Sequence, residues 1–180
     1  MALGLISQGK RLMGRFIQRR KVIELDLGSE TDIALIDAVM TSDQFIGARA
    51  LLDPSSLKAA LLCRADPAGV GMTSLGGLLA PVSDNEDAGL LVEFGEGGKT
   101  LTAPMIPGKM SDIPIASCRR VGLDRTITFE GPCALALDGE REHVLTEGAR
   151  LSMRVSREGP GVVDIGGVLA AAARNKWFLK

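Results

Sequence analysis

The stretch from Cys133 to Val144, CALALDGEREHV, constrains the fold of this chain more than any other. Apolar residues lead up to Asp138-Gly139, and charged residues follow it. An Asp-Gly pair between two strand-like runs predicts a β-hairpin, because a type I′ turn needs positive φ at both central residues and these two residues tolerate it. The predicted hairpin presents the Asp138 carboxylate at its tip. Two interpretations of this carboxylate stay open here: it only makes the turn, or it also borders a ligand site.

Short strand-like segments recur along much of the chain. Residues 22–27 and 151–155 alternate in the way that half-buried strands do. Turn signals separate such segments, for example at Glu147-Gly148 and at residues 159–161. This spacing is typical of an antiparallel sandwich or barrel. The predicted fold class is therefore mainly β, antiparallel and sandwich-like.

A few short helices complete the expected organisation. Basic residues cluster in residues 1–21, which are predicted to be a basic helix or a linker remnant. An Asp-Pro-Ser-Ser sequence has the pattern of a helix start and predicts a short helix over about residues 54–62. An alanine-rich helix and tail are expected in residues 166–180. Residues 22–165 form the predicted β-rich domain between these ends.

Composition argues against several classes of partner and site. Aromatic residues make up 3% of the chain, which argues against stacking platforms for single-stranded nucleic acid. A net charge of −1 gives no general attraction to nucleic acid or to anionic membranes. Three cysteines without a C-x-x-C pattern, and a single histidine, predict neither a disulfide framework nor a metal site. We therefore expect a cytoplasmic protein without a nucleic-acid or membrane partner.

A glycine-rich stretch, DPAGVGMTSLGGLL from Asp66 to Leu79, and three acidic residues supply the candidate ligand residues. Glycine lets the backbone approach a ligand closely, although glycine turns also occur for structural reasons alone. Asp37 interrupts an apolar run, so it faces either water or a site. No nucleophile lies beside an obvious base, and no catalytic residue is predicted. The candidate ligand-binding residues are Asp37, Gly69, Gly71, Thr73, Ser74, Gly76, Gly77, Asp112, Asp138 and Gly139.

The sequence GEGGKT, from Gly95 to Thr100, is an incomplete phosphate-binding motif. The P-loop needs a glycine five residues before the glycine of its Gly-Lys pair, and Glu93 occupies that position. The flanking segments 90–94 and 101–105 are strand-like. A hairpin tip is therefore predicted at this glycine loop.

Four segments, taken together and in order, resemble a known superfamily. They are ALIDAVMT (34–41), MTSLGGLLAPV (72–82), APMIPGKMSDIPI (103–115) and ALALDGERE (134–142). Their order is similar to that in the C-terminal domain of the NAD kinase and diacylglycerol kinase superfamily. Within this superfamily, the chain looks most like the ATP-NAD-kinase-like acetoin catabolism protein X group. The resemblance covers residues 22 to about 165.

This resemblance implies a two-domain kinase. An N-terminal α/β domain carries a Gly-Gly-Asp-Gly-Thr (GGDGT) loop for the ATP phosphates, and the β-rich domain supplies much of the acceptor site and an oligomer interface. The Gly-Gly pairs at 76, 97 and 166 are not followed by Asp-Gly-Thr. The implied partners are a second copy of the chain, a separate GGDGT-type catalytic domain, and a small-molecule or nucleotide ligand. ATP or NAD is expected as a cofactor only because the intact proteins of the family have this architecture. Nothing in this sequence itself requires a cofactor.

Departures from the NAD kinase pattern fall in the ligand-binding segments. Ile36-Asp37 stands where those enzymes have Asn-Glu, and Asp66–Gly71 stands where they have Thr-Gly-Ser-Thr-Ala-Tyr. Pro107-Gly108 replaces a Pro-His step, whereas Asp138-Gly139-Glu140 keeps the Asp-Gly of an Asp-Gly-Gln step. Two functional hypotheses follow: the acceptor-binding half of an ATP-dependent kinase, or a non-catalytic module that oligomerises or senses a metabolite.

Overall fold

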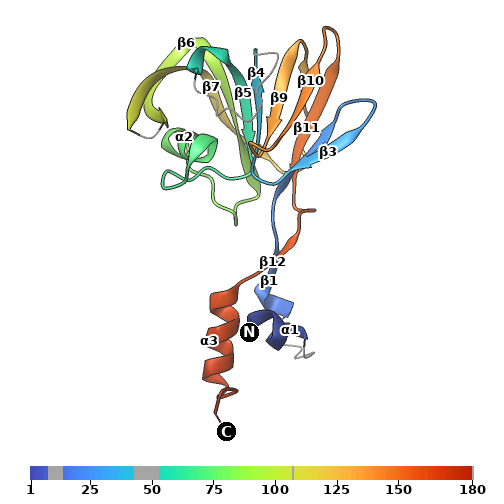
Figure 1. The fold of residues 1–180 in the computed structure, drawn as a ribbon, viewed down its shortest axis with the longest axis vertical. Coiled ribbons are helices and arrows are strands. Elements are labelled where there is room, and N and C mark those ends of the chain that lie inside the picture. The colour runs from blue at the N-terminus through green and yellow to red at the C-terminus, as the bar shows by residue number, and fades with distance from the viewer. Residues whose placement is uncertain (8–13, 43–52, 107, 180) are drawn as a thin grey trace. The chain divides into compact units, whose positions relative to one another are not determined.

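A computed structural model describes residues 1–7, 14–42, 53–106 and 108–179. The chain divides into two compact units (Figure 1). Residues 21–157 form the first, which we call the sheet unit, and residues 1–20 and 158–180 form the second, which we call the terminal unit. No helix among the described residues is long and apolar enough to cross a membrane.

The sheet unit contains two antiparallel sheets, which confirms the predicted mainly β fold class. The six-stranded sheet has the order β10-β9-β4-β5-β6-β7, and the four-stranded sheet has the order β3-β2-β11-β8. The strands of the larger sheet are β4 (Asp37–Thr41), β5 (Leu57–Leu62), β6 (Ala88–Ile106), β7 (Lys109–Gly122), β9 (Cys133–Leu137) and β10 (Arg141–Leu145). Those of the smaller sheet are β2 (Val22–Asp26), β3 (Thr31–Ala34), β8 (Ile127–Glu130) and β11 (Arg150–Ser156).

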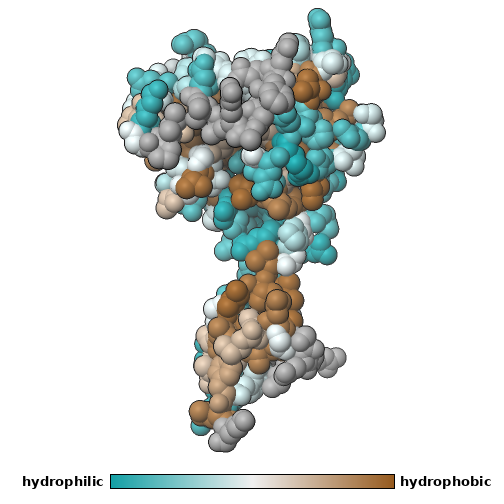
Figure 2. Space-filling model, viewed as in Figure 1, coloured by the Kyte–Doolittle hydropathy of each residue, from teal (hydrophilic) through white to brown (hydrophobic). Residues whose placement is uncertain are grey.

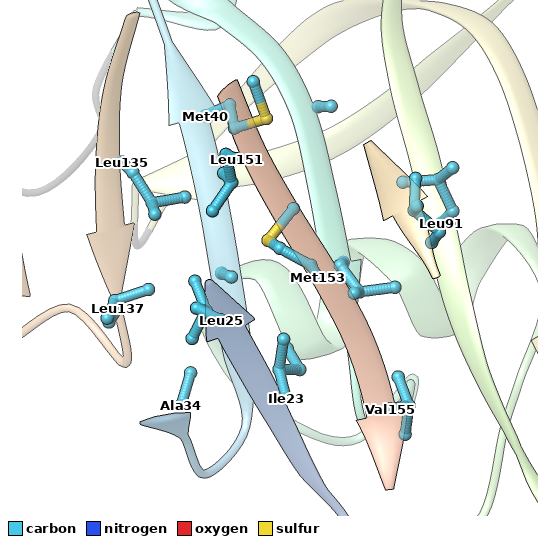
Figure 3. Packing of buried hydrophobic residues seen from close by; sticks show 14 of the residues in the cluster. Ile23, Leu25, Ala34, Met40, Leu91, Leu135, Leu137, Leu151, Met153 and Val155 are labelled. Atoms are coloured by element: carbon cyan, nitrogen blue, oxygen red, sulfur yellow. The ribbon is translucent and has the colours of Figure 1, made fainter. Parts of the chain in front are cut away.

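Both faces of the six-stranded sheet are covered over its central strands. One face packs against the four-stranded sheet, where Ile23 and Met153 meet Leu135 and Leu137 in a single apolar core (Figure 3). The other face packs against helix α2 (Gly71–Leu79), whose Leu75 joins a second apolar cluster. Because β9 is buried on both faces, all five of its residues are buried, and the alternation of a half-buried strand is absent.

The same double burial explains one incorrect prediction. Asp53 caps a helical turn as expected, and its carboxylate accepts the Ser55 N–H at 2.9 Å. The helix is a single 3₁₀ turn, Pro54–Ser56, and the predicted continuation over residues 57–62 is wrong because those residues form β5. Periodicity cannot separate a strand buried on both faces from a short buried helix.

The predicted hairpin tip at Gly95–Thr100 is also wrong. Strand β6 continues past it and pairs with β7 on both sides, and Phe94 and Lys99 both lie opposite Ile115. The residues between them bulge out of the ladder. A β-carbon on Gly98 would lie 2.0 Å from the Ile115 carbonyl oxygen, so the bulge requires glycine there.

Helix α2 lies close to the sheet because of its two adjacent glycines. A β-carbon on Gly76 would lie 2.3 Å from Leu62 Cδ1, and one on Gly77 would lie 2.2 Å from the backbone nitrogen of Pro67. The first neighbour is the end of a flexible side chain, but the second is backbone that has to move. Gly77 therefore fixes the distance between α2 and the loop that precedes it.

We expect Gly77→Ala to lower the free energy of unfolding by about 2 kcal/mol, as overpacking against backbone does. Gly166→Ala, in the C-terminal helix, is the matched control, because its nearest neighbour would be 3.6 Å away and alanine is the better helix former. Urea unfolding of both variants measures the difference. Equal midpoints for the two variants would show that the close contact at Gly77 is not needed.

The terminal unit joins the two ends of the chain. It contains α1 (Ala2–Ser7), a 3₁₀ turn η1 (Gly14–Phe16), β1 (Ile17–Arg19) paired antiparallel with β12 (Gly161–Val163), and α3 (Ile165–Arg174). The C-terminal helix is confirmed, and Trp177 packs against its cluster around Val168. Of the predicted basic helix, residues 8–13 lie outside the described residues, while residues 14–19 form the 3₁₀ turn and β1.

Candidate functional site

The Asp138-Gly139 turn forms as predicted. Strands β9 and β10 pair as a hairpin, and both turn residues have positive φ, +54° and +70°. The Glu140 N–H donates to the Leu137 carbonyl at 3.0 Å and closes the turn. The two positive φ angles and this bond are the features expected of a type I′ turn.

The Asp138 carboxylate turns inward and binds the backbone between β3 and β4. Its Oδ2 accepts the N–H of Leu35 at 2.8 Å, and its Oδ1 accepts the N–H groups of Ile36 at 2.7 Å and Asp37 at 3.2 Å. In return the Asp138 N–H donates to the Asp37 carbonyl at 3.0 Å. One carboxylate thus fixes the path of residues 35–37 and the start of β4.

Asp37 is held beside this anchor with its own carboxyl half-buried. Burial, with a smaller contribution from the neighbouring Asp138 carboxylate, raises the pKa of Asp37 to about 6. A carboxyl with such a pKa changes its charge close to neutral pH. The second cause follows from the contact between the two residues, because the Asp138 carboxylate accepts the Asp37 N–H.

A network of charged side chains supports the hairpin from its other side. Arg141 forms an ion pair with Asp32 on β3 and donates to the Ile33 carbonyl at 2.5 Å. His143 Nε2 lies 2.9 Å from Asp32 Oδ2. Burial acts to raise the pKa of Asp32, but hydrogen bonds from His143, the Ile33 N–H and Arg141 together lower it. These contacts tie β10 of one sheet to β3 of the other.

A cavity of about 1020 Å³ opens on the α2 side of the six-stranded sheet. Val39 of β4 and Ala136 of β9 lie on the sheet face that α2 shares, and both line the cavity. The start of α2, residues 104–105 of β6 and residues 138–142 of the hairpin line it as well. Six of the predicted ligand residues line it: Asp37, Gly69, Gly71, Thr73, Asp138 and Gly139.

The four other predicted residues do not line this cavity. Gly76 and Gly77 face Leu62 and Pro67 in the packing of α2. The Ser74 hydroxyl donates to the Pro67 carbonyl at 3.3 Å. Asp112 lies on β7, where it accepts a hydrogen bond from the Thr102 hydroxyl at 2.6 Å.

Several residues that line the cavity were not singled out from the sequence. Arg64 and Asp66 follow β5, and Glu140, Arg141 and Glu142 follow the turn. The signals for the last three were their place in the segment ALALDGERE and, for Glu140, its position directly after the Asp-Gly step. The apolar part of the lining includes Met72, Leu75 and Met105, and nothing in the sequence separates these from core residues. In the described part of the chain, no three His, Cys, Asp or Glu side chains come together as metal ligands.

Comparisons with known proteins identify the family. A family model for the acetoin catabolism protein X C-terminal domain matches residues 21–158, which include the whole sheet unit. Acetoin catabolism protein X of Cupriavidus necator is 32% identical over 184 aligned positions. The alignment covers 97% of this chain and 51% of the relative, so the chain spans about half the length of this curated relative. The chain therefore belongs to the family of acetoin catabolism protein X C-terminal domains.

Proposed function

We propose that the sheet unit is the acceptor-binding half of an ATP-NAD-kinase-like phosphotransferase, and that its cavity binds the hydroxyl group of a nucleotide or small metabolite. The proposal rests on the position of Asp37, a cavity-lining carboxyl whose pKa is raised to about 6. All four segments that resemble the NAD kinase and diacylglycerol kinase superfamily contribute residues to this cavity, which supports an inherited acceptor site. The name of the C. necator relative supports a link to acetoin catabolism.

In the proposed reaction, Asp37 accepts the proton of the acceptor hydroxyl. The hydroxyl oxygen forms a bond to the γ-phosphorus of ATP, and the bond between that phosphorus and the bridging oxygen of ADP breaks. A carboxylate with a pKa near 6 suits this role because it is mostly ionised at neutral pH and more basic than an ordinary aspartate. The groups that hold the ATP phosphates come from a GGDGT-type domain, whose signature this sequence lacks.

The terminal unit is the proposed contact surface for that domain. Leu3 on α1 and Ile165 on α3 are 70% and 60% exposed, and Phe178 is 48% exposed. Figure 2 shows hydrophobic side chains over much of the visible face of this unit. Exposed apolar patches are typical of interaction sites, and the curated relative is about twice as long as the aligned region. These observations support a contact with a separate catalytic domain.

A second candidate function is binding without phosphoryl transfer. The Asp138 carboxylate is occupied by backbone N–H groups. This structural use of the carboxylate favours a metabolite-sensing or oligomerising module. Sedimentation of the purified chain tests the homo-oligomer that this alternative includes.

Calorimetric titration of the purified chain with acetoin, adenosine, NAD and ATP at millimolar concentration tests the proposed function. We expect heat with at least one hydroxyl-bearing probe, and loss of that heat in Asp37→Asn. Asp112→Asn is the matched control, because Asp112 lies outside the cavity, and it should bind as the wild type does.

Two further outcomes separate the candidates. No heat with any probe contradicts an acceptor site in the sheet unit. If a probe binds but never gains a phosphoryl group from ATP when a GGDGT-type domain is added, the chain binds its ligand without transfer.

A further inference from the structure

We infer that the ligand of this cavity is a molecule without phosphate groups that combines several hydroxyl groups with an apolar body, and that the cavity discriminates against nucleotides. This inference rests on the proposed function, since it names the acceptor that the same cavity takes. It differs from the ligands expected by resemblance, because ATP and NAD both carry phosphates.

The charged groups around the cavity are mostly negative. The residues that line it include the acidic Asp37, Asp66, Asp138, Glu140 and Glu142 and the basic Arg64 and Arg141. Like charges brought together on binding weaken the complex strongly. The phosphate of a nucleotide therefore meets an unfavourable field here.

The two arginines do not compensate for this field, because each already lies beside carboxylates. Arg141 forms its ion pair with Asp32 and lies 4.0 Å from Asp138. Arg64 Nη1 lies 3.6 Å from Asp84 Oδ2. A phosphate has to compete with these internal partners for either guanidinium.

The start of α2 is the other place where an anion could gain stabilisation. The backbone N–H groups at a helix start attract anions, and Val70 provides no side-chain cap. However, Asp66 places a carboxylate in the loop that leads into this helix start, with its Oδ1 accepting the Ala68 N–H at 2.9 Å. The Asp66 backbone also bonds to Thr73 in the first turn, which holds this negative charge near the helix start.

The same lining suits hydroxyl groups and an apolar body. Carboxylates are acceptors only, so they bind the O–H groups of a polyol and offer nothing to another anion. Met72, Leu75 and Met105 provide an apolar surface that a ring or hydrocarbon portion can cover. A cavity of about 1020 Å³ has the size of sites that hold molecules as large as a nucleoside.

Calorimetry with adenosine and adenosine monophosphate tests this inference, because the two probes differ only in the phosphate. We expect adenosine to bind about tenfold more tightly or better at low salt, and added salt to narrow the ratio because it screens the repulsion. The double variant Glu140→Gln, Glu142→Gln should also reduce the ratio of the affinity for adenosine to the affinity for adenosine monophosphate. Glu96→Gln, Glu147→Gln is the control, since it changes the net charge equally but outside the cavity lining, and it should keep the wild-type ratio.

The outcomes separate this inference from the function on which it rests. Equal or tighter binding of the monophosphate overturns the inference and leaves the acceptor site in place. A ratio that the two double variants change equally also overturns it, because the discrimination then comes from the charge of the whole protein. If neither adenosine nor the smaller neutral probe dihydroxyacetone binds, both the inference and the proposed acceptor site are wrong.

Discussion

Asp138→Asn lowers the free energy of unfolding at about pH 5 by roughly 3 kcal/mol, because one carboxylate accepts three backbone N–H groups. Asparagine tolerates the positive φ of this position, so the turn itself remains favourable. Its amide has a single oxygen, however, and its NH₂ group faces an N–H donor. The Leu35 or Ile36 N–H then loses its acceptor.

The pH matters because Asp138 also repels Asp37. Below pH 6 the neighbour is mostly protonated, so the substitution gains little from removing the like charge. Chemical denaturation at about pH 5 therefore measures the loss of the three hydrogen bonds with little contribution from the repulsion between Asp37 and Asp138.

Asp124→Asn is the matched control for this experiment. Asp124 also has positive φ, +60°, but it lies in an exposed turn. We expect a change within about 0.5 kcal/mol, as for other surface substitutions. If the two variants lose the same stability, the Asp138 carboxylate is not the anchor of residues 35–37.

Asp37→Asn stabilises the protein above pH 6, and the gain disappears near pH 4. The folded protein raises the pKa of this carboxyl from 3.8 to about 6, so the folded state binds the proton more tightly than the unfolded state. The free energy of unfolding of the wild type therefore falls as the pH rises from about 4 to about 6, and it stays level above that. The difference of about two pKa units corresponds to about 3 kcal/mol.

Urea unfolding between pH 4 and pH 7 measures this contribution in the wild type and in Asp37→Asn. As the pH rises from 4 to 7, the free energy of unfolding of the wild type should fall relative to that of Asp37→Asn. Asp138→Asn should reduce the slope, because it removes the second cause of the raised pKa. Parallel pH profiles for the wild type and Asp37→Asn would contradict the buried, raised-pKa state of this carboxyl.

Local sequence signals predicted the Asp138-Gly139 turn and the Asp53 cap better than the central elements. The Asp138-Gly139 turn and the Asp53 cap depend on side chains within a few residues of each other, so they can be read from a short window. Strand β5 was predicted as helix because its burial on both faces removes the period of two. Helix α2 was interpreted only as a glycine-rich stretch. Its adjacent glycines fit a helix because they pack closely against Leu62 and Pro67, and these tertiary contacts cannot be read from the local sequence.

The cavity could be predicted only in part, for a related reason. Asp37 and Asp138 were both singled out, but their pairing depends on β4 and β9 lying side by side in the sheet. The resemblance placed four segments in order, yet it did not say which side chains face inward. Asp112 belongs to one of these segments and lies outside the cavity, whereas Pro104 and Met105 of the same segment line it.

A pH titration of the Asp37 carboxyl group tests the central claim that this residue holds a ligand hydroxyl. It is followed by the NMR signal of the carboxyl carbon, with and without adenosine. The account predicts a pKa near 6 in the free protein and a lower pKa with adenosine, because an O–H donor stabilises the ionised carboxylate. The Asp112 carboxyl signal should show no response to adenosine. A free-state pKa of Asp37 near its ordinary value, or an unchanged pKa when adenosine binds, would contradict the account.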